Sequence, residues 1–171
     1  MQSRPTILIL MGVTGSGKTT IGKLLSDDLG WAYFDADDFH PAANVEKMTL
    51  GIPLDDQDRE PWLLTLRSVI NNCLEADEPA VLACSALKED YRDRLLVDSR
   101  VQLVYLKGDS ELIGRRLNQR QGHYMNPALL SSQFATLEEP AGGLTIDVSQ
   151  SPEDIVTAIE QHFQIERPSH P

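Results

Sequence analysis

A glycine-rich segment close to the N-terminus carries residues whose types and spacing suit the binding of phosphate. Gly12, Gly17, Lys18 and Thr19 occupy the fixed positions of the pattern G-x-x-x-x-G-K-[ST]. In that pattern the glycines let backbone N–H groups turn toward phosphate oxygens, the lysine reaches the β- and γ-phosphates, and the threonine hydroxyl binds Mg²⁺. The segment therefore predicts a site for a nucleoside triphosphate with Mg²⁺. The alternative to a phosphate-binding site is a glycine-rich turn that contains a lysine by chance.

An acidic cluster follows a second apolar run, 31–34, and its spacing suits phosphoryl transfer. Asp35 and Asp37 are separated by one residue, so an extended backbone would turn both carboxylates toward one side. One carboxylate near Mg²⁺ and one near an acceptor hydroxyl are what transfer to an alcohol requires. The alternative is a solvated acidic turn that caps the helix starting at Pro41. His40 is explained as well by capping or packing as by ligand binding.

Basic residues are few, and their positions limit the substrates that the chain can take. The formal net charge is −11 and the pI is about 4.7. This charge argues against a nucleic-acid partner or an anionic membrane surface, since both need a basic patch. Lys47, Arg59 and Lys88 are local cations in otherwise acidic surroundings. They predict an anionic small-molecule substrate.

A second basic group precedes a glycine-containing segment. Arg115, Arg116 and Arg120 lie on a predicted helix, which the run QGHYMNPALL follows. Arginine presents forked donors that match phosphate oxygens. We therefore expect residues 116–137 to form a lid that closes over the phosphates and excludes water. For any single arginine, an ordinary solvated helix face is the alternative.

Alternating strands and helices position these groups. Strands are predicted at 7–11, 31–34, 80–84, 101–106 and 144–148. Helices are predicted from the glycine-rich loop to Gly30, over 41–50, from Pro61 onward after a charged turn, over 87–96, from a Ser110 cap to about 120, from 126–127 with Leu129, Leu130, Phe134 and Leu137 as its apolar face, and over 151–163. The alternation is typical of an α/β fold with a parallel sheet, in which ligands bind beyond the carboxyl ends of the strands.

Length and composition set further limits. At 171 residues a single domain is expected. Cys73 and Cys84 are expected to be buried free thiols, which suits a reducing compartment. No signal-peptide pattern and no apolar run of membrane-spanning length is present, so a cytoplasmic protein is expected. Ser85 follows the third predicted strand, where many NTPases carry a second Mg²⁺ aspartate, and N-K-x-D is absent; a switch GTPase is therefore disfavoured.

Four longer runs carry a family resemblance over nearly the whole chain. They are DADDFHPAANVEKMTLGIPLDDQDREPWL, CSALKEDYRDRL, YLKGD and RLNQRQGHYMNPALLSSQFATLEEP. These runs resemble the gluconate kinases, within the nucleoside-monophosphate-kinase-like and shikimate-kinase-like group. The resemblance implies ATP-dependent phosphorylation of the 6-hydroxyl of D-gluconate. It also implies the strand order 2-3-1-4-5 and a homodimer.

The resemblance further implies roles for individual residues. Mg²⁺ would lie near Thr19 and Asp35, and the residues with catalytic roles would be Lys18, Asp37 and Arg120. Gluconate would contact Asp37, His40, Lys47, Arg59 and Lys88, with Arg59 pairing with its carboxylate. ATP would be held by Gly12, Val13, Thr14, Gly15, Ser16, Gly17, Lys18, Thr19, Thr20 and Arg116.

Two other functions stay open on the residues alone. One is a kinase of another small acceptor, such as shikimate or a nucleoside monophosphate. The other is a nucleotide-dependent binding or switch protein with negligible turnover. Release of ADP that depends on the acceptor separates a kinase from a switch.

Overall fold

Five parallel strands form the centre of the protein. The computed structural model describes residues 4–119 and 127–169. The strands are β1 (Ile7–Met11), β2 (Ala32–Asp35), β3 (Ala80–Ala83), β4 (Val101–Lys107) and β5 (Leu144–Asp147). They lie in the order β2-β3-β1-β4-β5, and each neighbouring pair is parallel. The predicted fold class and strand order are confirmed.

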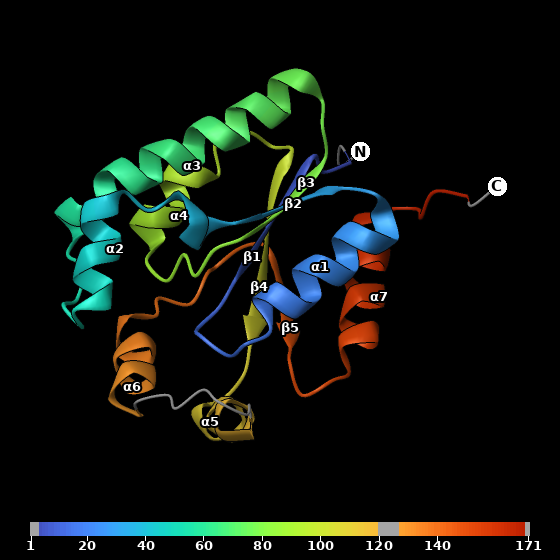
Figure 1. Cartoon of the computed structure of the whole chain (residues 1–171). Helices are drawn as coiled ribbons and strands as arrows, with labels where there is room; N and C mark the ends of the chain where they lie inside the picture. The colour runs from blue at the N-terminus through green and yellow to red at the C-terminus, as the bar shows by residue number, and fades with distance from the viewer. Residues whose placement is uncertain (1–3, 120–126, 170–171) are drawn as a thin grey trace.

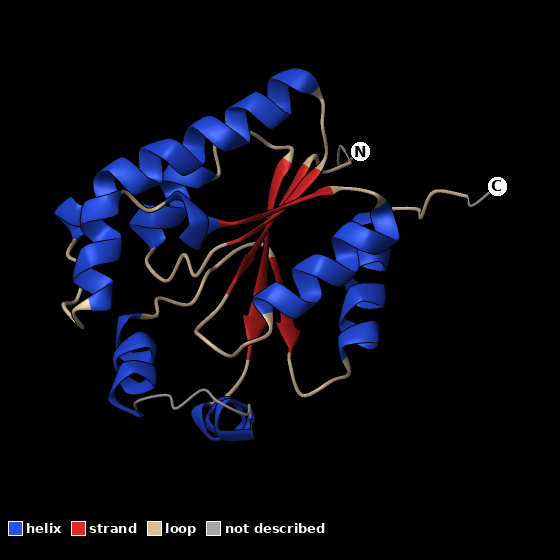
Figure 2. Cartoon of the chain, viewed as in Figure 1, coloured by secondary structure: helices blue, strands red, loops and turns tan. Residues whose placement is uncertain are grey.

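Helices cover both faces of this sheet (Figures 1 and 2). In β1, Ile7, Ile9 and Met11 join the core formed with α3 (Asp56–Ala76) and α4 (Glu89–Leu95). Leu8 and Leu10 join the opposite core, formed with α1 (Lys18–Leu29) and α7 (Pro152–Phe163). Burying a side chain of this size stabilises the fold by about 1.5–3 kcal/mol. Because β1 is buried on both faces, it is a continuous apolar run rather than an alternating one.

The remaining short elements lie around the end of the sheet at which the strands terminate (Figure 1). They are the 3₁₀ turn η1 (Ala36–Phe39) and the helices α2 (Ala42–Thr49), α5 (Ser110–Gln119) and α6 (Pro127–Thr136). On α6, Leu130 is buried, but Leu129 is 50% exposed, so its predicted place on the apolar face is wrong. Among the described residues, no helix combines the length and the apolar character needed to cross a membrane.

The starts of α3, α5 and α4 differ from the predictions, and each of these starts is met by a carboxylate. The start of α3 is Asp56 and not Pro61, because the Asp55 and Asp58 side chains each accept the other's backbone N–H, at 2.7 Å and 3.1 Å respectively. The expected charged turn is thus the first turn of α3. For α5, Asp109 takes the capping role predicted for Ser110 and accepts from the Leu112 N–H at 2.7 Å.

The third difference concerns α4, which begins at Glu89 and not at Leu87. A carboxylate from elsewhere in the chain meets this start, because Glu138 Oε2 accepts from the Glu89 N–H at 2.9 Å. Leu87 precedes the helix and packs instead with Val13 and residues of α5 and α6. Cys73 and Cys84 are both buried and free, as predicted.

Candidate active site

The loop between β1 and α1 has a conformation that requires glycine. At Gly15, φ is +83°, and a Cβ atom would lie 2.7 Å from Leu117 Cγ of α5. At Gly12, a Cβ atom would lie 2.5 Å from Ser16 Oγ. Both distances are shorter than a side chain tolerates, so these glycines are needed for the chain to close around an anion.

The interior of this loop is rich in hydrogen-bond donors. Lys18 Nζ donates to Gly12 O at 2.9 Å and to Val13 O at 3.0 Å, which holds its ammonium group at the loop. Burial lowers the pKa of Lys18, against the opposing effects of Cys84, Asp37 and Asp35. Since α1 begins at Lys18, its first N–H groups have no partner within the helix.

The donor set of the loop fits a polyphosphate. Ser16 Oγ is buried and has no hydrogen-bond partner within the described residues. The Ser16 hydroxyl, the positive end of α1 and the ammonium group of Lys18 together form a site that can bind an anion. Thr19 lies in the exposed first turn of α1, where its hydroxyl can reach a bound cation.

The two aspartates of the acidic cluster are brought to the same cavity by a tight turn. Asp35 is the last residue of β2, and its Oδ1 accepts from the Asp37 N–H at 3.0 Å. Asp37 therefore lies in the turn η1, and the predicted extended backbone is wrong, because this hydrogen bond bends the chain directly after the strand. A cavity of about 160 Å³ is lined by Asp35 and Asp37 together with Thr14, Gly15, Gly17, Lys18, Thr19, Ala83 and Ser85.

Asp37 has the electrostatic environment expected of a group that exchanges protons. Desolvation within the site, and then the neighbouring Asp35 carboxylate, raise its pKa. The side chain is 82% exposed, so the carboxylate lies at the mouth of the cavity, where an acceptor molecule can reach it. A carboxylate in this position can accept or orient the proton of an attacking hydroxyl.

His40 is held rigidly beside Asp37. Its ring stacks on Trp62 at a centroid distance of 4.5 Å, and its side chain is 6% exposed. His40 Nδ1 lies 3.3 Å from Asn44 Nδ2, which can only donate, so the neutral ring carries its proton on Nε2. Burial lowers the pKa of His40, which favours this neutral form.

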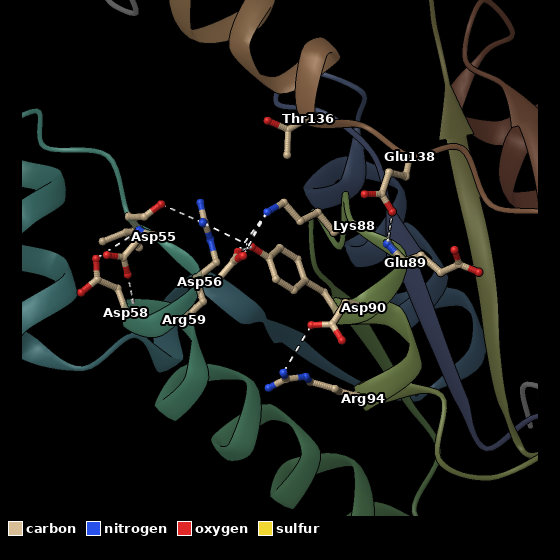
Figure 3. A network of polar contacts seen from close by, with 12 residues as sticks. Asp55, Asp56, Asp58, Arg59, Lys88, Glu89, Asp90, Arg94, Thr136 and Glu138 are labelled. Atoms are coloured by element: carbon tan, nitrogen blue, oxygen red, sulfur yellow. Dashed lines mark hydrogen bonds and ion pairs between the residues drawn. The ribbon is translucent and has the colours of Figure 1, made fainter.

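The three cations predicted to bind the acceptor lie around the first turn of α3, and Figure 3 shows two of them, Arg59 and Lys88, within a network of polar contacts. Lys47 is 2.8 Å from Asp58, and Lys88 is 3.0 Å from Asp56. Arg59 Nη1 donates to Leu54 O at 2.8 Å and lies 3.4 Å from the Tyr91 hydroxyl. Within the described part of the chain, Arg59 is the one of these three cations without a carboxylate at ion-pair distance.

The predicted lid residues are only partly described. Arg116 lies on α5 and is close to Asp147, the last residue of β5. The pKa of Asp147 is lowered mainly by hydrogen bonds from Ser149, and the positive charge of Arg116 lowers it further. Arg120 lies outside the described residues. The structure therefore brings the glycine-rich loop, Asp35 and Asp37 into one cavity, and it leaves Lys47, Arg59, Lys88 and Arg116 off the lining of that cavity.

Sequence reasoning missed one polar residue that contacts the glycine-rich loop. Gln133 of α6 forms two hydrogen bonds with Thr14, which is 119 residues away in the chain. A signal was present in the sequence, because Gln133 shares a helical face with Leu130 and Leu137. A polar side chain on an apolar face usually has a specific partner.

Comparisons with known proteins agree with this geometry. Residues 14–162 match the family model described as Shikimate kinase. A probable gluconokinase of Mus musculus is 43% identical, over 91% of this chain and 96% of its own. A gluconokinase of Gluconobacter oxydans (strain 621H) is 39% identical, over 97% of this chain and 96% of its own.

A solved structure adds the same relationship in three dimensions. The crystal structure of a gluconokinase from Sinorhizobium meliloti 1021 has a TM-score of 0.79 with this fold and is 36% identical. The similarity covers 95% of this chain and 99% of that one. With the phosphate-binding loop and the paired aspartates in one cavity, these likenesses show that the chain belongs to the gluconokinase family of P-loop kinases, within the shikimate-kinase-like group.

Proposed function

We propose that the protein transfers the γ-phosphoryl group of ATP to the 6-hydroxyl of D-gluconate, giving 6-phospho-D-gluconate and ADP. The observation that carries this proposal is the single cavity lined both by Lys18 and Thr19 of the phosphate loop and by the Asp37 carboxylate. A phosphate cradle and a proton acceptor within one cavity are the two parts that phosphoryl transfer to an alcohol needs. The gluconokinase relatives supply the identity of the alcohol.

The protein side of the reaction is mainly positioning and charge stabilisation. Lys18 would neutralise charge on the transferred group, and Asp37 would orient or accept the proton of the attacking hydroxyl. Thr19 and Asp35 would hold Mg²⁺, which supplies charge neutralisation when bound. Asp35 Oδ1 accepts the Asp37 N–H, which holds this carboxylate at the cavity where a cation would bind. A triphosphate bound beside Lys18 at the start of α1 would also give the buried Ser16 hydroxyl a hydrogen-bond partner.

The acceptor would extend from Asp37 toward α3. His40 carries its proton on Nε2, so its neutral ring can donate a hydrogen bond to a hydroxyl of the acceptor. Arg59 is the candidate for the gluconate carboxylate, because Lys47 and Lys88 already have aspartate partners in the described structure. Lys47 and Lys88 would line the site and contact the hydroxyls of the sugar acid. Arg116, with Arg120 beyond α5, would face the nucleotide within a lid over residues 116–137.

We also propose that the protein is a homodimer that works in the cytoplasm. The dimer rests on the family resemblance, and the compartment is supported by the two buried free thiols, Cys73 and Cys84. Light scattering coupled to size-exclusion chromatography measures the assembly directly. A monomer at micromolar concentration would contradict the first part of this proposal.

A panel assay tests the reaction. ADP production from ATP and Mg²⁺ is measured with gluconate, shikimate, AMP and hexoses as separate acceptors. We expect turnover with gluconate far above the acceptor-free rate. Faster turnover with shikimate or AMP would assign the protein to another acceptor, and slow hydrolysis indifferent to every acceptor would point to a nucleotide-dependent switch.

A further inference from the structure

Helix α6 contacts the phosphate-binding loop through the amide group of Gln133. Gln133 Oε1 accepts from the Thr14 N–H at 2.6 Å, and Gln133 Nε2 donates to Thr14 Oγ1 at 2.8 Å. The two bonds hold the main chain and the side chain of the same loop residue. They join the loop to a helix that begins more than a hundred residues later in the chain.

The chemistry of the partners settles the orientation of this amide. A backbone N–H can only donate, so the Gln133 carbonyl oxygen must face it. The amide nitrogen then faces Thr14 Oγ1 and, because it cannot accept, must donate to it. The Thr14 hydroxyl therefore acts as an acceptor toward Gln133, and its single proton remains available for a different acceptor.

The position of Thr14 indicates what that acceptor is. Thr14 lines the same cavity as Lys18 and Asp37. Lysine of this motif reaches the β- and γ-phosphates. The transferred phosphoryl group must lie between this lysine and the carboxylate that meets the acceptor hydroxyl. A phosphoryl oxygen is thus the ligand that a donor at Thr14 would meet.

Gln133 reaches Thr14 from a helix that packs against the phosphate-binding loop. Leu130 of α6 is buried in one cluster with Val13 of the loop, and Phe134 packs against the same cluster. Just beyond the helix, Glu138 N donates to Leu87 O at 2.8 Å. This packing and the backbone hydrogen bond hold α6 against the loop in the described structure, so the Gln133 side chain meets Thr14 there.

We propose that Gln133 is a positioning residue that holds the Thr14 hydroxyl as a hydrogen-bond donor toward the γ-phosphoryl group of ATP. This inference rests on the proposed phosphoryl transfer from ATP, but not on the identity of the acceptor. Gln133 itself does not touch the nucleotide. Its effect passes through one hydroxyl, which distinguishes it from a residue that merely braces α6.

Binding of two nucleotides without any acceptor tests the proposal. Dissociation constants for ADP and for a non-hydrolysable ATP analogue are measured with Mg²⁺ by calorimetry, together with melting temperatures. Thr14→Val keeps the shape of the side chain but removes the hydroxyl. A hydrogen bond to a charged group corresponds to about a 10- to 150-fold change in affinity. We expect Thr14→Val to lose about this much for the ATP analogue, with ADP affinity changed little.

Two substitutions at Gln133 separate positioning from bracing. Gln133→Ala removes the bonds that orient the hydroxyl, so it should lower the ratio of ATP-analogue affinity to ADP affinity. In Gln133→Glu, the carboxylate can accept from both the N–H and the hydroxyl of Thr14. The contacts to α6 are then kept while the proton turns away from the phosphate, so the same ratio should fall without a large loss of melting temperature. The fall should be smaller when Thr14 is already replaced by valine, which separates the turned proton from repulsion by the new charge.

The controls decide between the outcomes. Combining Gln133→Ala with Thr14→Val should lower the ratio no further than Thr14→Val alone, because both changes act through one hydroxyl. Ser131→Ala, at an exposed position of α6, should leave the ratio unchanged. An equal loss of ADP and ATP-analogue affinity in the Gln133 variants, or an unchanged ratio in Thr14→Val, would overturn the proposal. A changed ratio in a protein that does not phosphorylate gluconate would support it and reject only the choice of acceptor.

Discussion

His40 Nε2 lies 4.0 Å from Asp37 Oδ1, and the stacking of the His40 ring on Trp62 keeps it there. The proton on Nε2 faces the carboxylate that meets the acceptor. Burial of His40 disfavours a charged ring, so the pair presents one anion and one neutral donor near neutral pH. This pair links the phosphate cavity to the network of Arg59 on α3, since the charge of Arg59 also lowers the pKa of His40.

Replacing the lysine of the phosphate loop should remove most of the activity. In Lys18→Ala, the two hydrogen bonds to loop carbonyls disappear, but the apolar packing of β1 and α1 is untouched, so the fold should persist. Loss of one oriented charge on the transferred group lowers kcat by ~10²-fold or more. Steady-state kinetics and a thermal melt measure the two effects. Near-normal turnover in a folded variant would contradict the assigned role.

Arg59 should contribute to binding of gluconate but not of ATP. Arg59→Ala should raise the gluconate KM roughly 10- to 150-fold, as expected for a lost charge-assisted bond of about 1.5–3 kcal/mol. Arg59→Lys keeps the charge but loses the forked geometry, so it should also weaken gluconate binding. The ATP KM should change little in both variants, because Arg59 does not line the phosphate cavity.

The same side chain also braces the start of α3 through Leu54 O, so stability must be measured beside the kinetics. Arg94→Ala is a matched control, because Arg94 of α4 pairs with Glu60 of α3 and with Asp90 of its own helix. An unchanged gluconate KM in Arg59→Ala would exclude Arg59 from the site. Loss of melting temperature alone, in both Arg59 variants, would assign it the bracing role.

Asp37→Asn should separate stability from activity. Since the folded protein raises the pKa of Asp37, the contribution of this group to stability is present below its ordinary pKa of 3.8 and is lost as the pH rises through the raised value. At pH 7 the ionised carboxylate therefore disfavours folding, and Asp37→Asn should melt at or above the wild-type temperature. This difference should shrink as the pH is lowered toward the ordinary pKa.

The same variant should lose ~10²- to 10⁴-fold in kcat, the usual contribution of a general base. In the wild type, kcat/KM should fall as the pH drops through the raised pKa of Asp37, because protonation removes the base. Asp38→Asn, at the next residue of the same exposed turn, is the matched control and should keep most of the activity. A fully active Asp37→Asn protein would show that the carboxylate only shapes the turn.

Trp62 should be important for both stability and the position of Asp37. Its Nε1 donates to Ala36 O at 2.7 Å in a buried setting, and its ring supports His40. Trp62→Phe leaves that carbonyl without its partner, at a cost of about 1–3 kcal/mol in the free energy of unfolding. Urea denaturation measures this cost. Leu64→Ala, on an exposed site of the same helix, should change the free energy by less than about 0.5 kcal/mol.

The sequence by itself determined the features that depend on neighbours along the chain. The phosphate loop, the five strands and their alternation with helices follow from short-range spacing and from apolar runs such as Ile7–Met11, which local geometry converts directly into structure. The strand order came from the resemblance of long motifs. The capping of α3 at Asp55 was also visible in principle, because both of its partners lie within four residues.

Only the tertiary structure decided contacts between distant residues. Asp56 lies against Lys88 because α3 and the start of α4 meet on one face of the sheet, whereas Arg59 has no carboxylate at ion-pair distance in the described chain. Gln133 meets Thr14 because α6 packs on Val13 of the phosphate loop. No local pattern encodes such a meeting, since it depends on how whole helices pack and on which buried polar groups they bring together.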